Sequence, residues 1–300
     1  MKRWAKRGVL ALLLLLSLGS AYLYGQNNWI QTTTYTVTSE KIPAEFEGFR
    51  IIQLSDLHSK MFGENQSVLS KEVTSLAPDA IITTGDMING TDRQGEAFLQ
   101  FVRQIRDVPI YYVSGNHEQI AASKAHNIGL SWYQNYLDEL RSLGVNIVDD
   151  ADVEIKRGDS SIQLAGLILP MRLYKRYDTA TYVGEKPYGA DRIEESVGPV
   201  SKSLFQILIT HNPMYADVYA DWGADLVLTG HVHGGIIRIP FVGGLLSPER
   251  DFFPKYDAGM FKIGDDNQTQ MLVNRGLGSA EFSWRVNNRP EISVVKLRTE

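Results

Sequence analysis

Eight side chains that can bind metal or transfer protons follow short apolar runs of this 300-residue chain. The eight are Asp56, His58, Asp86, Asn116, His117, His211, His231 and His233, and they include five of the six histidines of the chain. A single histidine after a strand is more often a hydrogen-bonded structural group. Five imidazoles gathered with two carboxylates are instead costly to desolvate unless they bind something. Nitrogen and oxygen donors without sulfur suit zinc, iron or manganese. Because the set is too large for one tetrahedral site, it predicts two ions that share a bridging carboxylate.

The apolar runs before these residues predict the strands that position them. The runs are Arg50–Ser55, Ala80–Thr84, Ile110–Ser114, Phe205–Thr210 and Asp225–Thr229. Helical patterns lie between and beside them, at Glu64–Leu76, Ala97–Ile105 and Trp132–Leu143. Strands that alternate with helices indicate βαβ units and a largely parallel sheet. Because the carboxyl ends of parallel strands meet at one edge of a sheet, we expect the eight residues to converge there.

The rest of the chain predicts a second sheet in the same domain. Val153–Leu169 has the pattern of a hairpin that turns at Gly158 and Asp159, and the C-terminal third is rich in strand patterns. We therefore expect an α/β fold with two sheets and helices outside, in one domain over residues 40–300. Pro170–Lys202 fits neither pattern. Its basic and aromatic residues suit contact with an anionic or sugar-bearing ligand, and a solvated surface loop is the equal alternative.

The first 39 residues predict an export segment and a linker outside the fold. Four cations within the first seven residues precede an uncharged apolar stretch of 17 residues, Gly8–Tyr24. This pattern is typical of an export signal, and the flanking cations argue against a buried core helix. Its length favours an uncleaved signal anchor, although Gly19-Ser20-Ala21 resembles a cleavage site. The positive-inside rule predicts a single-pass protein of the cell membrane with the catalytic domain outside the cytoplasm; cleavage would give a secreted protein.

Charge and cysteine content exclude several classes of function. The formal net charge is −5, and because the first seven residues contribute +4, the rest of the chain carries −9. An acidic body of this kind is a poor partner for the phosphate backbone of nucleic acids. The chain has no cysteine, which excludes disulfides, thiolate metal sites and thiol nucleophiles.

The order and spacing of these motifs resemble the calcineurin-like metallophosphoesterases, over about residues 48–280. The motifs are Asp56-x-His58, Gly85-Asp86, Gly115-Asn116-His117-Glu118, His211 and Gly230-His231-x-His233. Within that superfamily the chain is similar to bacterial, membrane-associated phosphoesterases with an N-terminal export segment. The resemblance implies the calcineurin-like phosphoesterase fold, a four-layer sandwich of two mixed β-sheets flanked by helices.

The resemblance also implies a role for each of the eight residues. The first metal ion would be held by Asp56, His58, Asp86 and His233, and the second by Asp86, Asn116, His211 and His231. Asp86 would bridge the ions, and His117 would donate a proton to the leaving group rather than bind metal. Glu118, which follows His117, receives no chemical role. The two ions would be manganese, iron or zinc, with manganese favoured.

Such a site predicts a metal-dependent phosphoric ester hydrolase. Two cations about 3.5–4 Å apart neutralise phosphate oxygens and lower the pKa of a bridging water, which gives hydroxide near neutral pH. We expect a phosphodiesterase or a pyrophosphohydrolase that acts on a lipid- or glycan-linked substrate at the outer face of the membrane. A phosphomonoesterase with the same site is the alternative. A surface metal-binding module without turnover is disfavoured, because coordination does not need His117. The sequence indicates no particular oligomeric state.

Overall fold

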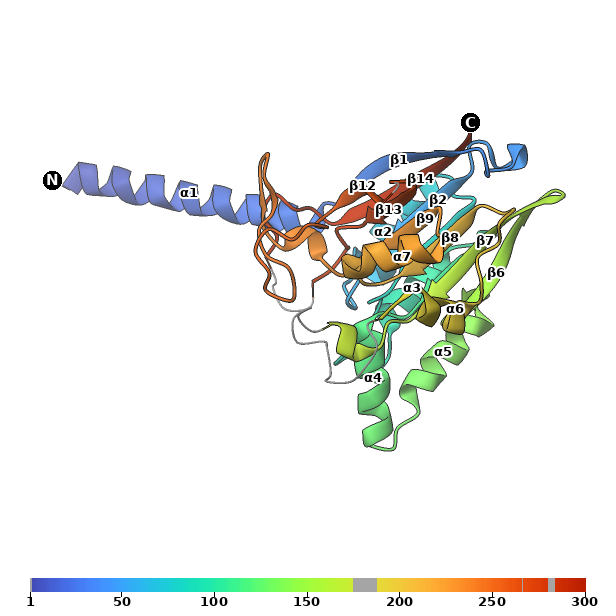
Figure 1. Cartoon of the computed structure of the whole chain (residues 1–300). Helices are drawn as coiled ribbons and strands as arrows, with labels where there is room; N and C mark the ends of the chain where they lie inside the picture. Colours follow the sequence, from blue (N-terminus) through green and yellow to red (C-terminus); the bar gives the residue numbers. More distant parts are fainter. Residues whose placement is uncertain (1, 175–187, 266, 280–283) are drawn as a thin grey trace.

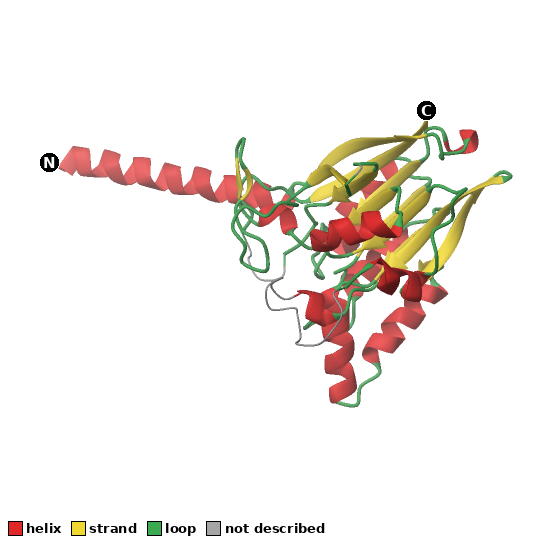
Figure 2. Ribbon diagram, viewed as in Figure 1, coloured by secondary structure: helices red, strands yellow, loops and turns green. Residues whose placement is uncertain are grey.

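The computed structural model describes residues 2–174, 188–265, 267–279 and 284–300. Most of these residues form a body of two β-sheets covered by helices, and one long N-terminal helix projects from it (Figures 1 and 2). That helix, α1, spans Lys2–Asn28. Among the described residues it alone is long and apolar enough to cross a membrane, a property that it shares with signal sequences.

The first sheet has six strands in the order β1-β14-β2-β3-β4-β5. Their bounds are β1 Gln31–Ser39, β14 Glu291–Thr299, β2 Arg50–Leu54, β3 Ala80–Thr84, β4 Ile110–Val113 and β5 Val145–Ile147. The four strands from β2 to β5 run parallel, as the sequence predicts. β14 is antiparallel to β2 and parallel to β1, so the sheet is mixed.

The second sheet also has six strands, in the order β12-β13-β9-β8-β7-β6. Their bounds are β12 Gly259–Ile263, β13 Thr269–Val273, β9 Leu226–Thr229, β8 Gln206–Thr210, β7 Ser160–Leu167 and β6 Ala151–Arg157. β6 and β7 form the expected antiparallel hairpin around Gly158 and Asp159, whereas β7, β8, β9 and β13 are parallel. A separate small hairpin joins β10, Arg238–Ile239, to β11, Gly243–Gly244.

Alternation along the strands builds the inner layer between the two sheets. Ile51 of β2 and Ile82 of β3 belong to one buried cluster with Ile207 of β8 and Leu228 of β9. The neighbouring residues Ile52 and Ile81 fall in a different cluster. Because successive side chains of a strand point to opposite faces, each sheet has an inner face against the other sheet and an outer face for helices.

Helices cover the two outer faces. On the first sheet they are α2 Ser67–Ser75, α3 Glu96–Gln104, α4 Asn116–Asn127 and α5 Trp132–Ser142; on the second they are α6 Ala190–Val197 and α7 Ala216–Trp222. Short 3₁₀ helices occur at η1 Ala44–Phe46, η2 Glu64–Gln66, η3 Met171–Tyr174, η4 Pro213–Tyr215 and η5 His233–Gly235. The predicted four-layer sandwich of two mixed sheets flanked by helices is confirmed.

Among the elements that differ from the expectation are β1, α4, α7 and also α6, which lies within Pro170–Lys202, a stretch that fits neither pattern. The sequence predicts that residues 1–39 lie outside the fold. In the structure Gln31–Ser39 form β1, which is paired along its length with β14. Four of its five threonines are exposed and only Val37 is buried, so its sequence does not resemble a core strand. The helix α4 was also not predicted, because its buried positions are Glu118, Ala121 and Ala125 and form no apolar stripe.

Candidate active site

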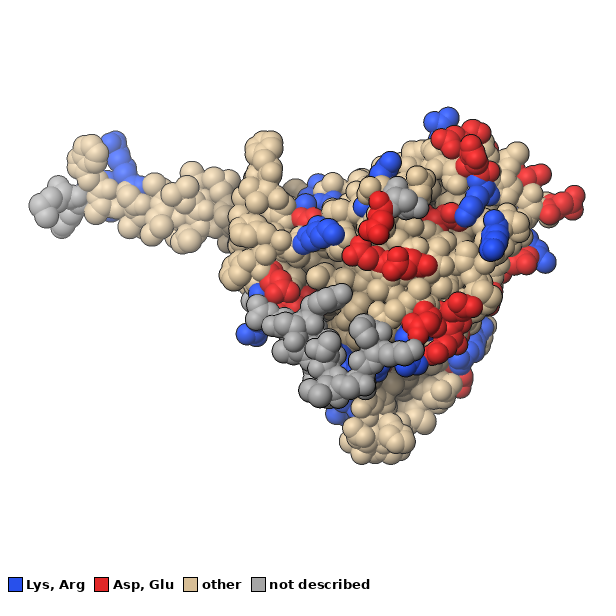
Figure 3. All heavy atoms as spheres, in the orientation of Figure 1, with Lys and Arg blue, Asp and Glu red and all other residues tan. Residues whose placement is uncertain are grey.

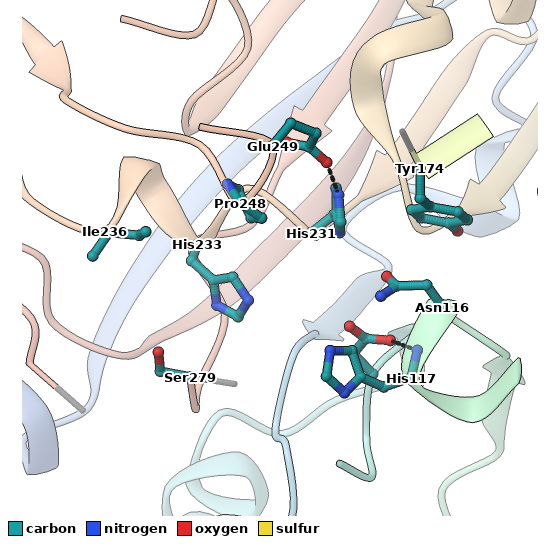
Figure 4. A pocket seen from close by; sticks show the side chains of 10 residues that line it. Asn116, His117, Tyr174, His231, His233, Ile236, Pro248, Glu249 and Ser279 are labelled. Carbon is teal, nitrogen blue, oxygen red and sulfur yellow. Dashed lines mark hydrogen bonds and ion pairs between the residues drawn. The ribbon is translucent and has the colours of Figure 1, made fainter. Parts of the chain in front are cut away.

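The structure brings all eight predicted residues together where strands of both sheets end. Asp56 and His58 follow β2, Asp86 follows β3, and Asn116 and His117 begin α4 after β4. His211 follows β8, and the remaining two histidines follow β9. Asn116 and His117 line a pocket of about 200 Å³ together with Asp86, His231 and His233 (Figure 4). The predicted convergence at the carboxyl edge is therefore present, and it draws on both sheets.

Three groups of potential ligand atoms lie close enough to hold metal ions, each with its ligand atoms within 4.8 Å of one another. Asp56, His58 and His233 form the first and Asp86, His211 and His231 the second, and the third, His58, Asp86 and His117, includes the predicted proton donor. In the first, His58 Nε2 lies 3.2 Å from His233 Nε2, and the latter lies 3.5 Å from Asp56 Oδ1. The first two groups coincide with the two ligand sets that the resemblance implies, apart from the shared Asp86 and the amide of Asn116.

Asp86 lies between the first two groups. Its Oδ2 is 3.0 Å from His211 Nε2 and 3.7 Å from His58 Nε2. Asp56 is placed similarly, since its Oδ1 is 3.8 Å from both of these nitrogen atoms. Both side chains are buried, but Asp86 is among the residues that line the pocket and Asp56 is not. The pocket-facing carboxylate is the better placed of the two to meet both ions and a substrate.

The chemistry of the donors fits metal ions. His211 Nδ1 lies 2.6 Å from the carbonyl oxygen of Thr84, so its N–H donates there and its Nε2 faces Asp86. Asn116 Oδ1 is buried and has no hydrogen-bond partner in the part of the chain that the structure describes. An amide oxygen left this way is suited to coordinate a cation.

The buried carboxylates of the site also favour a bound positive charge. Burial acts to lower the pKa of His211, but Asp86 and then Asp56 raise it to about 10, because the two carboxylates favour a positive charge beside them. Burial acts to raise the pKa of Asp86, and the charge of His211 overcomes it and keeps that pKa well below the ordinary value. Burial lowers the pKa of His58 to about 3, which keeps this imidazole neutral, as metal binding requires.

The backbone is strained at five of the predicted ligands. Positive φ angles occur at Asp56 (51°), His58 (48°), Asp86 (58°), His231 (69°) and His233 (51°). Such angles are uncommon outside glycine and persist only where the surrounding structure fixes them. Their concentration at strand ends is a typical property of a functional site. No sequence pattern indicates it.

Glu118 holds the Asp86 loop against the start of α4. Its Oε2 accepts hydrogen bonds from the backbone amides of Asp86 and Gly115, both at 2.9 Å, and its Oε1 accepts one from Ile88 at 3.2 Å. Burial and then the charge of Asp86 raise the pKa of Glu118 to about 8. Glu118 therefore positions a predicted ligand, which agrees with a residue that orients the loop and has no chemical role of its own.

His117 has a defined tautomer. Its Nδ1 accepts a hydrogen bond from the backbone amide of Gly90 at 2.9 Å, so neutral His117 carries its proton on Nε2. Its backbone amide donates to Asp86 Oδ1 at 2.8 Å, at the N-terminus of α4, where a helix favours negative charge. His117 is thus next to the predicted bridging carboxylate, with a proton on the nitrogen that is free of the backbone.

Two further side chains line the pocket: Glu249, which the sequence analysis did not single out, and Tyr174, which belongs to the expected ligand-contacting stretch Pro170–Lys202. Glu249 Oε1 contacts His231 Nε2, which leaves His231 Nδ1 for another partner (Figure 4). The ring of Tyr174, in η3, lies 5.1 Å from that of His231. Burial acts to raise the pKa of Glu249, but His231 lowers it to about 2, so Glu249 is ionised.

The expected functional loop Pro170–Lys202 is only partly described. Lys175, Arg176, Tyr177, Tyr182 and Lys186 lie outside the described residues. Tyr174 does line the pocket. Contact of this loop with a ligand therefore stays a prediction.

Comparisons with known proteins agree on enzymes that act on phosphate esters and diphosphates. The sequence profile of the calcineurin-like phosphoesterases matches residues 49–235. The chain is 29% identical to the uncharacterized metallophosphoesterase YkuE of Bacillus subtilis, over 95% of this chain and 92% of that protein. It is 26% identical to the phosphodiesterase YaeI of Escherichia coli, over 94% and 93% of the two chains. It is 23% identical to the UDP-2,3-diacylglucosamine pyrophosphatase LpxG of Chlamydia trachomatis, over 90% and 89%.

Proposed function

Because the chain belongs to the calcineurin-like phosphoesterase family, we propose that it hydrolyses phosphodiester or pyrophosphate bonds of lipid- or glycan-linked substrates. It is a metal-dependent phosphoester hydrolase with a dinuclear metal site. The observation that carries the proposal of hydrolysis is the pocket, in which Asp86, from the first sheet, and His231, from the second, face a cavity of about 200 Å³. A site built only for structure would have no need of that cavity.

The assignment of ligands to the ions is part of the proposal. The first ion would be held by Asp56, His58, Asp86 and His233, and the second by Asp86, Asn116, His211 and His231. Manganese, iron and zinc all accept these nitrogen and oxygen donors without a thiolate, and manganese is the ion we favour. The ions supply charge that neutralises phosphate oxygens and lowers the pKa of water.

The chain's own residues orient and protonate the substrate in this proposal. His117 directs its Nε2–H at the departing oxygen, since its Nδ1 accepts from the amide of Gly90, and it would transfer that proton as the imidazolium. Glu118 fixes the Asp86 loop through three backbone amides, so the predicted bridging oxygen keeps its position. Glu249 fixes the ring of His231 in the same way from the opposite wall of the pocket.

The bond type is supported by the relatives. One relative is named as a phosphodiesterase and another as a pyrophosphatase of an acylated sugar nucleotide. A phosphomonoesterase with the same site is the second candidate, because the two ions act on any phosphate ester. Nucleic acid is disfavoured as a substrate, since the chain beyond its first seven residues carries −9.

The N-terminal helix supports a place at the membrane. We infer that α1 spans the cell membrane once and holds the catalytic body outside the cytoplasm, because the cations lie at its N-terminal end. The alternative is a secreted protein released by cleavage after Ala21. Both forms keep the contacts between Tyr22 and the body.

The test is hydrolysis by the full chain after removal and return of metal. The purified protein, stripped with a chelator, is supplied with manganese, iron or zinc and assayed on bis(p-nitrophenyl) phosphate and on p-nitrophenyl phosphate. We expect activity to return with manganese and to be greater on the diester. A higher rate on the monoester would favour the second candidate, and no metal-dependent hydrolysis of either would refute the proposal.

A further inference from the structure

Exposed apolar side chains are concentrated on one loop of the body. This loop, residues 236–253, contains the β10–β11 hairpin and is called the apolar loop below. Phe241 is fully exposed, and Val242, Phe252 and Phe253 are each more than half exposed. Soluble surfaces rarely present several large apolar side chains so close in sequence without a partner.

The apolar loop is fixed beside the base of α1. The backbone amide of Arg238 in β10 donates to the carbonyl of Val286 at 3.0 Å, and Asn287 Nδ2 donates to the carbonyl of Arg238 at 3.3 Å. In turn, Tyr22 Oη of α1 donates to Asn287 Oδ1 at 2.6 Å. Figure 1 shows the loop, in orange, at the end of the body from which α1 leaves, with its tip free of the body. The loop and the helix are therefore held in one arrangement.

No linker separates α1 from the body. The helix continues from its apolar part into a last turn whose residues bond the body, where Gln26 Oε1 accepts from the amide of Asn288 at 3.0 Å. The uncharged part Gly8–Tyr24 is about 25 Å long at 1.5 Å per residue, and a bilayer's hydrocarbon core is about 30 Å thick. A helix of this length cannot hold the body away from the membrane.

The aromatic residues of α1 mark where the membrane surface lies. Tyr22 and Tyr24 stand at the C-terminal end of its apolar part, Trp29 follows the helix, and all three are exposed. Tyrosine and tryptophan are enriched at membrane–water interfaces. In the view of Figure 3 the charged side chains of α1 lie at its far, N-terminal end, so the end near the body is the uncharged one. The interface thus falls at the level of Tyr22, beside the apolar loop.

The same loop also forms a wall of the catalytic pocket. Ile236, Pro248 and Glu249 line the pocket, and Glu249 contacts His231 (Figure 4). Ile236 is five residues from Phe241, and Glu249 is three residues from Phe252. Whatever surface receives the exposed side chains of the loop therefore lies near the metal pocket.

We propose that the apolar loop inserts Phe241, Val242 and Phe252 into the outer surface of the bilayer and so presents the catalytic pocket to phosphoesters of membrane lipids. This inference rests on the proposed function and deepens it by naming the substrate class. The bilayer is the occupant because the loop is held beside a helix that ends in that same surface. A second copy of the chain is the less favoured occupant, because it would have to cover the apolar loop and still leave the neighbouring helix α1 free to span the membrane.

The absence of cysteine allows each position to be probed by one introduced thiol. Full-length variants Phe241→Cys, Asp159→Cys and Leu14→Cys carry a nitroxide and are reconstituted into vesicles of phosphatidylglycerol and phosphatidylethanolamine. Asp159 lies at the β6–β7 turn, at the opposite end of the body from α1 (Figure 1). We expect the labels at positions 241 and 14 to be accessible to oxygen and shielded from a nickel chelate, and the label at 159 to show the reverse.

The outcomes distinguish the insertion of the apolar loop from the membrane anchoring of α1. If the label at 14 is in lipid but that at 241 behaves like 159, the helix spans and the docking proposal is wrong. If neither is in lipid, the membrane anchor itself is wrong. Spin–spin broadening at position 241 alone would show that a second copy covers the loop, which also overturns the proposal.

A second experiment measures function with a matched control. The variant Phe241→Asp/Val242→Asp is compared with Ile128→Asp/Leu130→Asp, an exposed apolar pair at the turn between α4 and α5, far from α1. Both are assayed on soluble bis(p-nitrophenyl) phosphate and on dioleoylphosphatidyl-p-nitrophenol in vesicles. The loop variant is expected to lose hydrolysis of the lipid ester only, and the control to keep both. Equal hydrolysis of the lipid ester by the two variants overturns the docking proposal. If the wild type does not hydrolyse the soluble ester either, the proposed function itself is wrong.

Discussion

The carboxylate of Glu118 accepts a hydrogen bond from the backbone amide of Asp86, at 2.9 Å, although the two residues lie on different elements. The same carboxylate also accepts from Gly115 and Ile88, so one buried side chain ties together the turn after β3 and the start of α4. Asp86 has a positive φ of 58°, a conformation that needs such support. The last residue of the motif GNHE thereby positions the acid that we propose as the metal bridge.

Replacement of Glu118 by glutamine should therefore loosen the Asp86 turn. One of the two acceptor oxygens becomes an NH₂ group that faces a backbone N–H, and a buried donor left unpaired costs about 1–3 kcal/mol. We expect the free energy of unfolding to fall by that amount and metal affinity to fall with it. Chemical denaturation and metal analysis measure both effects. Glu195→Gln, at an exposed position of α6, is the control, and equal effects from the two variants would argue against a positioning role.

Metal content should distinguish the bridging carboxylate from the other ligands. Asp86→Ala is expected to remove both ions, whereas His58→Ala and His211→Ala should each weaken one site. Asp56 is the sharpest comparison, because its Oδ1 also lies 3.8 Å from His211 Nε2. Elemental analysis of the purified, folded variants gives the stoichiometry. Loss of both ions from Asp56→Ala and of one from Asp86→Ala would transfer the bridge to Asp56.

His117 is predicted to act on the leaving group and not on the metal. His117→Asn should lower the rate roughly 10²–10⁴-fold, the usual contribution of general acid catalysis. Metal content should stay near two ions, and the loss should be smaller for substrates with good leaving groups, which need less protonation. Steady-state rates on a series of aryl phosphodiesters measure this. A uniform loss across the series, or the loss of an ion, would contradict the role.

The orientation of α1 makes a prediction in living cells. Because the four cations precede Gly8, the body should be outside the cytoplasm. A reporter enzyme that is active only outside the cytoplasm, fused after Glu300, should therefore be active. Inversion of the charges, with Lys2, Arg3, Lys6 and Arg7 replaced by glutamate, should reduce that activity. Full-length protein found soluble in the cytosol would exclude the anchor.

The strand ends and their polar residues could be predicted from the sequence because each rests on a local pattern. Ala80–Thr84 is a continuous apolar run followed by Gly85 and Asp86, and the structure has β3 with those bounds. The expected hairpin at Gly158 and Asp159 is likewise present. Local patterns of this kind fix which residues end a strand, and parallel pairing then brings those ends together.

Features that depend on distant contacts were not predicted. Strand β1 is stabilised by pairing with β14, more than 250 residues away, and its own threonine-rich sequence gives no apolar signal. Glu249 contacts His231, which lies 18 residues earlier in the chain, and no spacing rule connects the two residues. The positive φ angles at five predicted ligands cannot be read from residue types.

The central claim is a pair of metal ions bridged by Asp86, and anomalous X-ray scattering from crystals of the full chain grown with manganese tests it most directly. The account predicts two anomalous peaks about 3.5–4 Å apart, both within bonding distance of Asp86, with Asp56, His58 and His233 at one and Asn116, His211 and His231 at the other. A single peak, or two peaks that share no ligand with Asp86, would contradict it.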